Sequence, residues 1–205
     1  MVPLLIFPVF GALFYLFVQL QIGTRLINHR LGINIKKTKK FLKQNKELME
    51  EIELEDKKVA NLAKYMNEYG GYPIYKNTSV KYFPLGEYKF EELKKQLEKA
   101  KRFIFLEYFI VEEGFMWNSI LEILERKVKE GVEVRFMYDG TCSLILLPYN
   151  YPKKMEKLGI KCKIFSPIKP ALSTYQNNRD HRKILVIDGH TAFTGGINLA
   201  DEYIN

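Results

Sequence analysis

From residue 72 to residue 205 the sequence alternates short β-type runs with amphipathic helical segments, and this alternation restricts the fold more than any other feature. Strand patterns occupy Val80–Phe83, Arg102–Ile110, Val132–Tyr138, Ile160–Phe165, Lys183–Ile187 and Thr191–Phe193, and helical patterns occupy Glu87–Lys99, Trp117–Glu130 and Lys153–Leu158. Strands that alternate with helices form a sheet with helices packed on its faces. We therefore predict that residues 72–205 form an α/β domain in which helices flank the sheet.

The N-terminal segment carries no charge from Leu4 to Leu20 and stays apolar to Ile22. An apolar run of this length can cross a bilayer core of about 30 Å as a helix. A cleaved signal peptide would carry a basic start and a small-residue cleavage site, and neither is visible. A helix buried in a protein core seldom needs so long an uncharged stretch. The sequence therefore predicts one transmembrane helix over residues 1–24, in front of the α/β domain.

Positive charges follow the apolar segment directly, at Arg25, at Arg30 and among the lysines between Lys36 and Lys40, and no basic residue precedes Leu4. Lysine and arginine are enriched on the cytoplasmic side of membrane helices. We therefore expect the part of the chain after the helix to lie in the cytoplasm, next to the cell membrane.

Residues 25–71 are basic first and acidic later, because lysines are frequent up to Lys46 and glutamates from Glu47 to Glu55. Apolar residues recur there at helical spacing, namely Leu48, Ile52, Val59, Leu62 and Met66. The pattern predicts an amphipathic linker helix that ends near Gly70 and Gly71. Its basic part could bind anionic lipid headgroups or could simply face solvent.

The formal net charge of +8 favours an anionic partner, either nucleic acid or an acidic lipid surface. Charge alone does not decide between them. The two cysteines, Cys142 and Cys162, are too few for a disulfide framework. Cys162 lies in a strand pattern, which predicts a buried, reduced thiol and agrees with a reducing cytoplasm.

His181 and Lys183 are two residues apart at the start of the predicted strand Lys183–Ile187. Residues two apart on an extended chain point to the same face, so we expect the imidazole and the ammonium group side by side, with Ile184 and Val186 turned toward the core. A neutral imidazole can attack phosphorus or protonate a leaving oxygen. A fixed ammonium group can neutralise the phosphate oxygens. This pair suits chemistry on a phosphodiester.

Three further positions extend this pattern. Asp188 stands at the end of the strand with the opposite parity, and we assign it to orienting the site through hydrogen bonds. Gly195 and Gly196 allow backbone N–H groups to approach an anion closely. Asn198 adds a side-chain donor, at what resembles the start of a helix, where anions are also favoured.

These residues, His181-x-Lys183-x-x-x-x-Asp188 followed by Gly195-Gly196-x-Asn198, resemble the signature of the phospholipase D superfamily. Wider phrases, Phe103–Ile110, Tyr138–Gly140 and Phe193–Tyr203, resemble the bacterial cardiolipin synthases in particular. The resemblance extends from the apolar N-terminal segment to the last residue. It implies a phospholipase D-like sheet and a phosphatidyltransferase that converts two phosphatidylglycerol molecules into cardiolipin and glycerol through a phosphohistidine.

The resemblance also implies a role for each motif residue. His181 would be the nucleophile or the general acid of a two-histidine mechanism, and Lys183 and Asn198 would grip the phosphate. No metal or cofactor is expected. The expected partners are the bacterial cell membrane and its anionic phosphatidylglycerol; nucleic acid is not expected, because an anchored enzyme already has lipid at hand.

The chain departs from this family pattern because it carries one such motif where two meet at a single site. The other histidines, His29 and His190, are not followed by lysine two residues on. We therefore expect residues 72–205 to be the first phospholipase D-like domain, incomplete at its C-terminal end. On this hypothesis the chain is inactive alone, or it needs the missing C-terminal half or a homodimer partner.

Two further features leave alternatives open. Glu107 lies in an apolar strand pattern and could face the cleft as an orienting carboxylate near the histidine, or could pair with a surface lysine on an edge strand. The apolar, proline-containing stretch 144–152 could dip into a bilayer or pack on the sheet. Three functions remain in competition, namely phosphatidyl transfer, hydrolysis of a phosphodiester by water, and an inactive membrane fragment that pairs with other chains.

Overall fold

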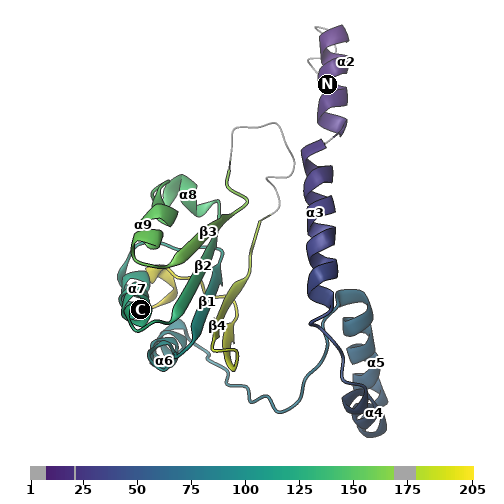
Figure 1. Cartoon of the computed structure of the whole chain (residues 1–205), viewed down its shortest axis with the longest axis vertical. Helices are drawn as coiled ribbons and strands as arrows, with labels where there is room; N and C mark the ends of the chain where they lie inside the picture. Colours follow the sequence, from purple (N-terminus) through teal and green to yellow (C-terminus); the bar gives the residue numbers. More distant parts are fainter. Residues whose placement is uncertain (1–7, 21, 169–178) are drawn as a thin grey trace. The chain divides into compact units, whose positions relative to one another are not determined.

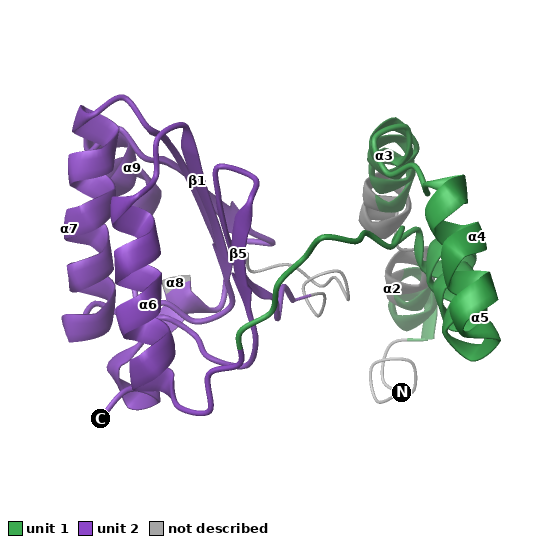
Figure 2. Ribbon diagram, turned by 90° about the horizontal axis from the view of Figure 1, so that it is seen from below, with its two compact units in different colours: residues 1–81 green, residues 82–205 purple. Residues whose placement is uncertain are grey.

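The computed structural model describes residues 8–20, 22–168 and 179–205, without the side chains of residues 14, 17–20, 22–27 and 143. The chain divides into two compact units, residues 1–81 and residues 82–205 (Figure 2). The second unit begins ten residues after the boundary that we predicted at residue 72.

The first unit is helical. It contains α2 (Pro8–Leu20), α3 (Ile22–Lys39), α4 (Lys46–Glu55), α5 (Lys57–Tyr65) and the π-helix η1 (Met66–Gly70). The single amphipathic linker helix that we predicted is divided at Asp56, whose extended backbone (φ −150°) ends α4. Its side chain accepts hydrogen bonds from the backbone N–H groups of Lys58 and Val59 and so caps α5.

The burial in this helix pair also differs from the prediction. Ala60 and Ala63 are buried, whereas Val59 and Leu62 are exposed. The predicted apolar stripe is buried at Leu48 in α4, but α5 buries its two alanines in place of the larger apolar residues. Small side chains permit a close approach of helices, and apolar size alone did not reveal which face packs.

The predicted transmembrane helix, residues 1–24, falls partly outside the described residues. Its described part consists of α2, which is thirteen residues long and spans about 20 Å as a helix, and of the first three residues of α3. Within the part of the chain that the structure describes, no helix combines the length and the apolar character that crossing a membrane requires.

The second unit contains a five-stranded mixed sheet in the order β3-β2-β1-β4-β5 (Figure 1). Its strands are β1 (Phe103–Tyr108), β2 (Glu133–Asp139), β3 (Lys161–Phe165), β4 (Lys183–Ile187) and β5 (Thr191–Thr194). The first three strands are parallel, and β4 is antiparallel to both of its neighbours, β1 and β5. The carboxyl ends of four strands therefore lie at the same edge as the start of β4.

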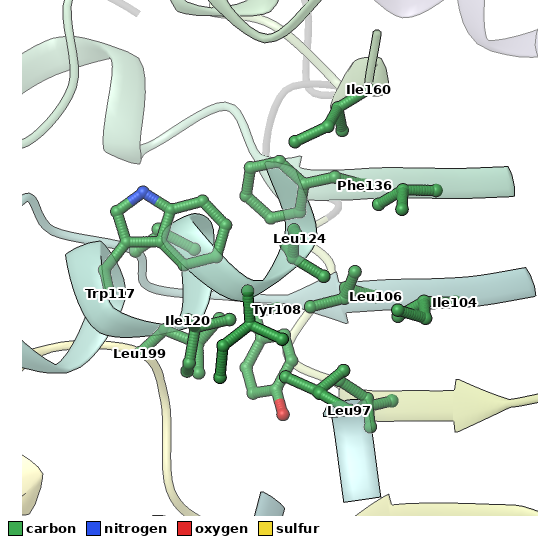
Figure 3. Close-up of a cluster of buried hydrophobic side chains, with 14 of the residues drawn as sticks. Leu97, Ile104, Leu106, Tyr108, Trp117, Ile120, Leu124, Phe136, Ile160 and Leu199 are labelled. Carbon is green, nitrogen blue, oxygen red and sulfur yellow. The ribbon is translucent and has the colours of Figure 1, made fainter. Parts of the chain in front are cut away.

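Helices α6 (Gly86–Glu98), α7 (Phe115–Lys129) and α9 (Tyr151–Lys157) cover one face of this sheet (Figure 2). The core lies between them and the strands, around the fully buried Trp117 (Figure 3). Its other members come from every layer of the unit, among them Leu97, Ile104, Leu106, Tyr108, Ile120, Leu124, Phe136 and Ile160. The α/β fold with helices beside a mixed sheet agrees with the prediction, except that the helices lie on one face.

The side of the sheet that faces the core was predicted wrongly for β4. Leu185 and Ile187 are 0% and 2% exposed and belong to the core, whereas Ile184 and Val186 are partly exposed on the other face. They line a hollow of about 800 Å³ there with Phe105 and other side chains. The prediction placed the core on the side of Ile184 and Val186, but residues 184–187 are all apolar, and such a run cannot show which face the helices cover.

Three local predictions also need correction. Residues 80–83 are not part of a strand, and Val80 and Tyr82 are 90% and 84% exposed. Cys142–Ile145 forms a short helix, α8, that was not predicted. Asn198 does not start a helix, because only the short 3₁₀ segment η3 (Asp201–Tyr203) follows it. The carboxylate of Asp201 instead caps the N-terminus of α7, by accepting from the backbone N–H groups of Phe115 and Met116.

Candidate active site

The predicted motif residues divide between the two ends of β4. His181 and Lys183 stand at the edge where β1, β2, β3 and β5 end, while Asp188 stands at the opposite edge. A strand from Lys183 to Asp188 measures about 17 Å. Ligands of sheets with parallel strands usually bind beyond the carboxyl ends of the strands. The edge with His181 is therefore the candidate active site, and Asp188 does not belong to it.

His181 and Lys183 both lie against the ring of Phe109, at the end of β1. The ring centroids of His181 and Phe109 are 4.7 Å apart, and Lys183 Nζ lies 5.0 Å from the centroid of the same ring. Lys183 Nζ donates a hydrogen bond of 2.7 Å to the carbonyl oxygen of His181. The structure thus brings the two side chains to one place, although His181 precedes the first residue of β4.

The two groups differ in their access to solvent. His181 is exposed, whereas Lys183 is 3% exposed. Burial lowers the pKa of Lys183, and the negative charge of Asp180 only partly offsets this effect. An exposed imidazole can reach a substrate from solvent, and a buried ammonium group without a full counter-charge gains most from a bound anion.

Asp188 holds two strands together at the other edge. Its carboxylate accepts hydrogen bonds of 2.9, 2.8 and 2.9 Å from the backbone N–H groups of Lys101, Arg102 and Phe103, just before and at the start of β1. Although burial raises it, the pKa of Asp188 stays below its ordinary value because these backbone hydrogen bonds stabilise the carboxylate. Any orienting influence on His181 must therefore act through the strand.

Gly195 and Gly196 follow β5 directly, at the same edge as Lys183. The backbone at Gly195 has φ +144°, a conformation that favours glycine. Asn198 is 3% exposed, and its amide is already engaged: Oδ1 accepts from the Ile110 N–H at 3.0 Å, and Nδ2 donates to the Tyr203 hydroxyl at 2.8 Å. The amide nitrogen carries a second N–H that could serve a ligand.

A buried carboxylate that the sequence analysis did not single out holds the segment before His181. Asp139, 0% exposed at the end of β2, accepts from the backbone N–H of Asp180 at 2.8 Å and from Arg179 Nη1 at 3.3 Å. It also accepts from the backbone N–H and the hydroxyl of Thr141. Its position directly after a strand, before a glycine, was the available signal. Asp139 positions the residues that lead into β4.

Glu107 joins a cluster with Asp180 and Arg182, and it has no lysine partner among the residues that the structure describes. Arg182 Nη2 lies 2.6 Å from Glu107 Oε1, outside hydrogen-bond alignment, and Arg182 Nε donates to Asp180 Oδ1 at 3.0 Å. Burial first, and then the neighbouring Asp180, raise the pKa of Glu107 to about 7, and Arg182 opposes them. These two carboxyl groups, one of them adjacent to His181 in sequence, favour sharing a proton.

The remaining candidate groups lie elsewhere. His190 is exposed beside Asp188, with Nδ1 2.9 Å from the Thr191 hydroxyl, and it is at the edge opposite His181. In the stretch 144–152, Leu147 is buried, while Leu144 and Ile145 are 61% and 88% exposed. The polar stretch before Arg179 lies outside the described residues. Within residues 8–20, 22–168 and 179–205, no cluster of histidine, cysteine and acidic side chains could hold a metal ion.

Comparisons with known proteins agree with this geometry. Residues 93–205 match the family model described as cardiolipin synthase, phospholipase D-like domain. A cardiolipin synthase of Halalkalibacterium halodurans is 34% identical over 216 residues, which cover 98% of this chain and 40% of that protein. An uncharacterized protein of Streptococcus mutans is 53% identical over 199 residues, 97% of this chain and 43% of its own length. The chain thus spans less than half the length of these curated relatives.

Among solved structures, NucT from Helicobacter pylori is similar to this chain with a TM-score of 0.44 and 15% identity. The likeness covers 58% of this chain and 71% of NucT.

Proposed function

Because the chain belongs to the family of cardiolipin synthases with a phospholipase D-like domain, we propose that it supplies one half of a phosphatidyltransferase site. The substrate is phosphatidylglycerol, and two molecules of it give cardiolipin and glycerol. One observation carries the proposal. His181 and Lys183 meet at the ring of Phe109, at the sheet edge where the Gly195-Gly196 turn also lies.

In the proposed reaction, an imidazole nitrogen of His181 attacks the phosphorus of one phosphatidylglycerol. The N–P bond forms as the P–O bond to the glycerol headgroup breaks, and a second histidine protonates the departing oxygen. A hydroxyl of a second phosphatidylglycerol then attacks phosphorus, gives its proton to that second histidine and releases His181. The exposed position of His181 supports this role. The same residue could serve as the general acid if the second histidine is the nucleophile.

Lys183 and the amide of Asn198 stabilise the phosphate oxygens in this scheme. Both side chains are 3% exposed, which supports the proposal because an electrostatic interaction gains strength where water is excluded. Asp188 contributes only by fixing β4 against the start of β1, and Glu107 contributes through Asp180, which leads into His181. The reaction as written needs no metal or cofactor.

This scheme needs a second histidine with a motif of its own. His190 lies at the opposite edge of the sheet, and neither His190 nor His29 is followed by lysine two residues on. We propose that the second motif is supplied by a C-terminal half, as the greater length of the relatives suggests, or by a second copy of the chain. A homodimer would place two His181 imidazoles in one site.

We further propose that the chain acts at the bacterial cell membrane, with residues 82–205 in the cytoplasm. The uncharged run from Leu4 to Leu20 and the basic residues that follow it support this proposal. Anionic phosphatidylglycerol is then available at the surface where the site works, and nucleic acid is not expected as a substrate.

Reconstitution into phosphatidylglycerol liposomes tests the proposed reaction. Cardiolipin and glycerol should form in equal amounts when the chain is dense enough to pair or when a C-terminal half is added, and His181→Ala should abolish both products. The oligomeric state is measured in parallel by sedimentation. Turnover by a proven monomer would contradict the two-motif site.

Hydrolysis is the second candidate, because the exposed His181 is also open to water. The ratio of products separates the two reactions. Phosphatidic acid in place of cardiolipin, from the same liposomes, would assign the chain to phosphodiester hydrolysis.

A further inference from the structure

A second buried lysine lies beside the glycine turn of the candidate site, on a different element. Lys89 belongs to the first turn of α6 and is 6% exposed. Its Nζ atom lies 3.8 Å from the position that a Cβ atom on Gly195 would take. Gly86, the first residue of the same helix, packs against the backbone of Tyr203, so the start of α6 is fixed against the segment that follows the glycine turn.

The ammonium group of Lys89 has no partner among the residues that the structure describes. Its Nζ atom is buried and donates no hydrogen bond to any described residue. An isolated buried charge is costly unless it is neutralised or meets a counter-ion. Burial lowers the pKa of Lys89, which is the consequence expected of an ammonium group in such a place.

The neighbouring groups point to an anion as the missing partner. Lys183 starts β4 opposite the turn, since Ile184 pairs with Thr194 and Gly195 follows directly. Tyr108, which pairs with Lys183 across β1 and β4, carries a buried hydroxyl that also lacks a partner among the described residues. Two lysines and a hydroxyl thus lie at the sheet edge of the glycine turn; Lys89 Nζ and the Tyr108 hydroxyl have no partner among the described residues, and Lys183 Nζ donates only to the carbonyl oxygen of His181.

We propose that Lys89 is a further phosphate-binding residue of this site, and that it holds the phosphate of the lipid headgroup from the side of α6 while Lys183 holds it from β4. This inference rests on the proposed function. Free phosphate presents the same oxygens, so both sources are tested. Two ammonium groups on one phosphodiester carry more positive charge than the phosphate can neutralise at rest, and this excess favours the additional negative charge of the transition state.

The test measures binding to the full chain in detergent by isothermal titration calorimetry. The probes are inorganic phosphate and dihexanoyl phosphatidylglycerol, below the concentration at which this lipid forms micelles. Lys89→Met should weaken both interactions by about tenfold, the loss of one charge-assisted hydrogen bond. The matched control is Lys95→Met, which removes the same charge from an exposed position on the same helix and should change binding by less than about twofold.

The outcomes distinguish this inference from the proposed function. If Lys183→Met weakens binding and Lys89→Met does not, the site stands and the role of Lys89 is wrong. If the unmodified chain binds neither probe, both fail. If Lys89→Met weakens the binding of phosphate alone, the assignment to the lipid headgroup is wrong.

Stability supplies an independent readout. Removal of a buried, unpaired charge should leave the thermal midpoint unchanged or higher when no anion is present. A Lys89→Met chain that unfolds at a lower temperature without phosphate would assign this lysine to the core and overturn the proposal.

Discussion

The two ends of β4 carry residues of one sequence motif under different physical conditions. At the start of the strand, His181 is exposed and Lys183 is buried with no carboxylate in a direct ion pair within the described structure. At its end, the Asp188 carboxylate accepts hydrogen bonds from three backbone N–H groups. His181 and Lys183 at the first end can still form hydrogen bonds or ionic contacts with a ligand. The carboxylate of Asp188 at the second end already forms its hydrogen bonds within the protein.

This difference shows that residues at fixed spacing need not share a task. A group whose hydrogen bonds are satisfied within the fold stabilises the fold, whereas a group that is held in place but left unsatisfied can act on a ligand. The two ends are linked through β4. Because Asp188 anchors the end of this strand against β1, the start of the strand at Lys183 is also held in position. Substitutions at each end of β4 separate these two tasks experimentally.

The largest effect is expected at the anchoring end. Asp188→Ala removes three hydrogen bonds to a charged acceptor and leaves alanine at φ +53°, so the free energy of unfolding should fall by about 3 kcal/mol. Urea unfolding followed by Trp117 fluorescence measures this change, since the one tryptophan of the chain is fully buried in the same unit.

His181→Ala is the matched substitution at the other end of β4. It removes an exposed side chain without buried hydrogen bonds among the described residues, and it should change the free energy of unfolding by less than about 0.5 kcal/mol. Equal losses for the two variants would show that the ends of β4 are not divided between folding and chemistry.

A pH-dependent effect, smaller than that of Asp188→Ala, is expected from Glu107. Its pKa of about 7 in the folded chain exceeds the ordinary value of 4.5, because of burial and of Asp180. As the pH rises from 4.5 to 7, the unfolded carboxyl group loses its proton first, which favours the unfolded state. Folding stability should therefore decrease over this range and stay constant above it.

Glu107→Gln should remove this dependence. We compare the free energy of unfolding of the variant with that of the unmodified chain at pH 4 and at pH 8. Because the side chain is partly exposed, this difference should move in favour of the variant by about 1 kcal/mol between the two pH values. Parallel stability curves between pH 4 and pH 8 would contradict the raised pKa of Glu107.

The sequence predicted the elements of the sheet well, because periodicity reports on local structure. Lys183–Ile187 is a strand with the predicted limits, and α6 and α7 begin and end within two residues of the prediction. Periodicity could not tell which face of β4 is covered, since Leu185 and Val186 are both apolar. That choice depends on the placement of helices far away in the sequence.

The sequence predicted only those parts of the candidate site whose residues are close together along the chain. His181 and Lys183 could be paired from their spacing. The contacts of Asp139 with Arg179 and Asp180, and of Lys89 with the turn at Gly195, join segments about 40 and 106 residues apart. No local pattern marks such pairs, because strand order brings them together.

Transfer of label from the lipid tests the central claim most directly. The chain, paired with a second copy or a C-terminal half, is incubated with phosphatidylglycerol labelled at its phosphate, quenched in alkali and digested, and the labelled peptide is identified by mass spectrometry. The account predicts acid-labile label on His181, absent from Lys183→Met and present on Glu107→Gln. Label on His190, or cardiolipin formation by His181→Ala, would contradict it.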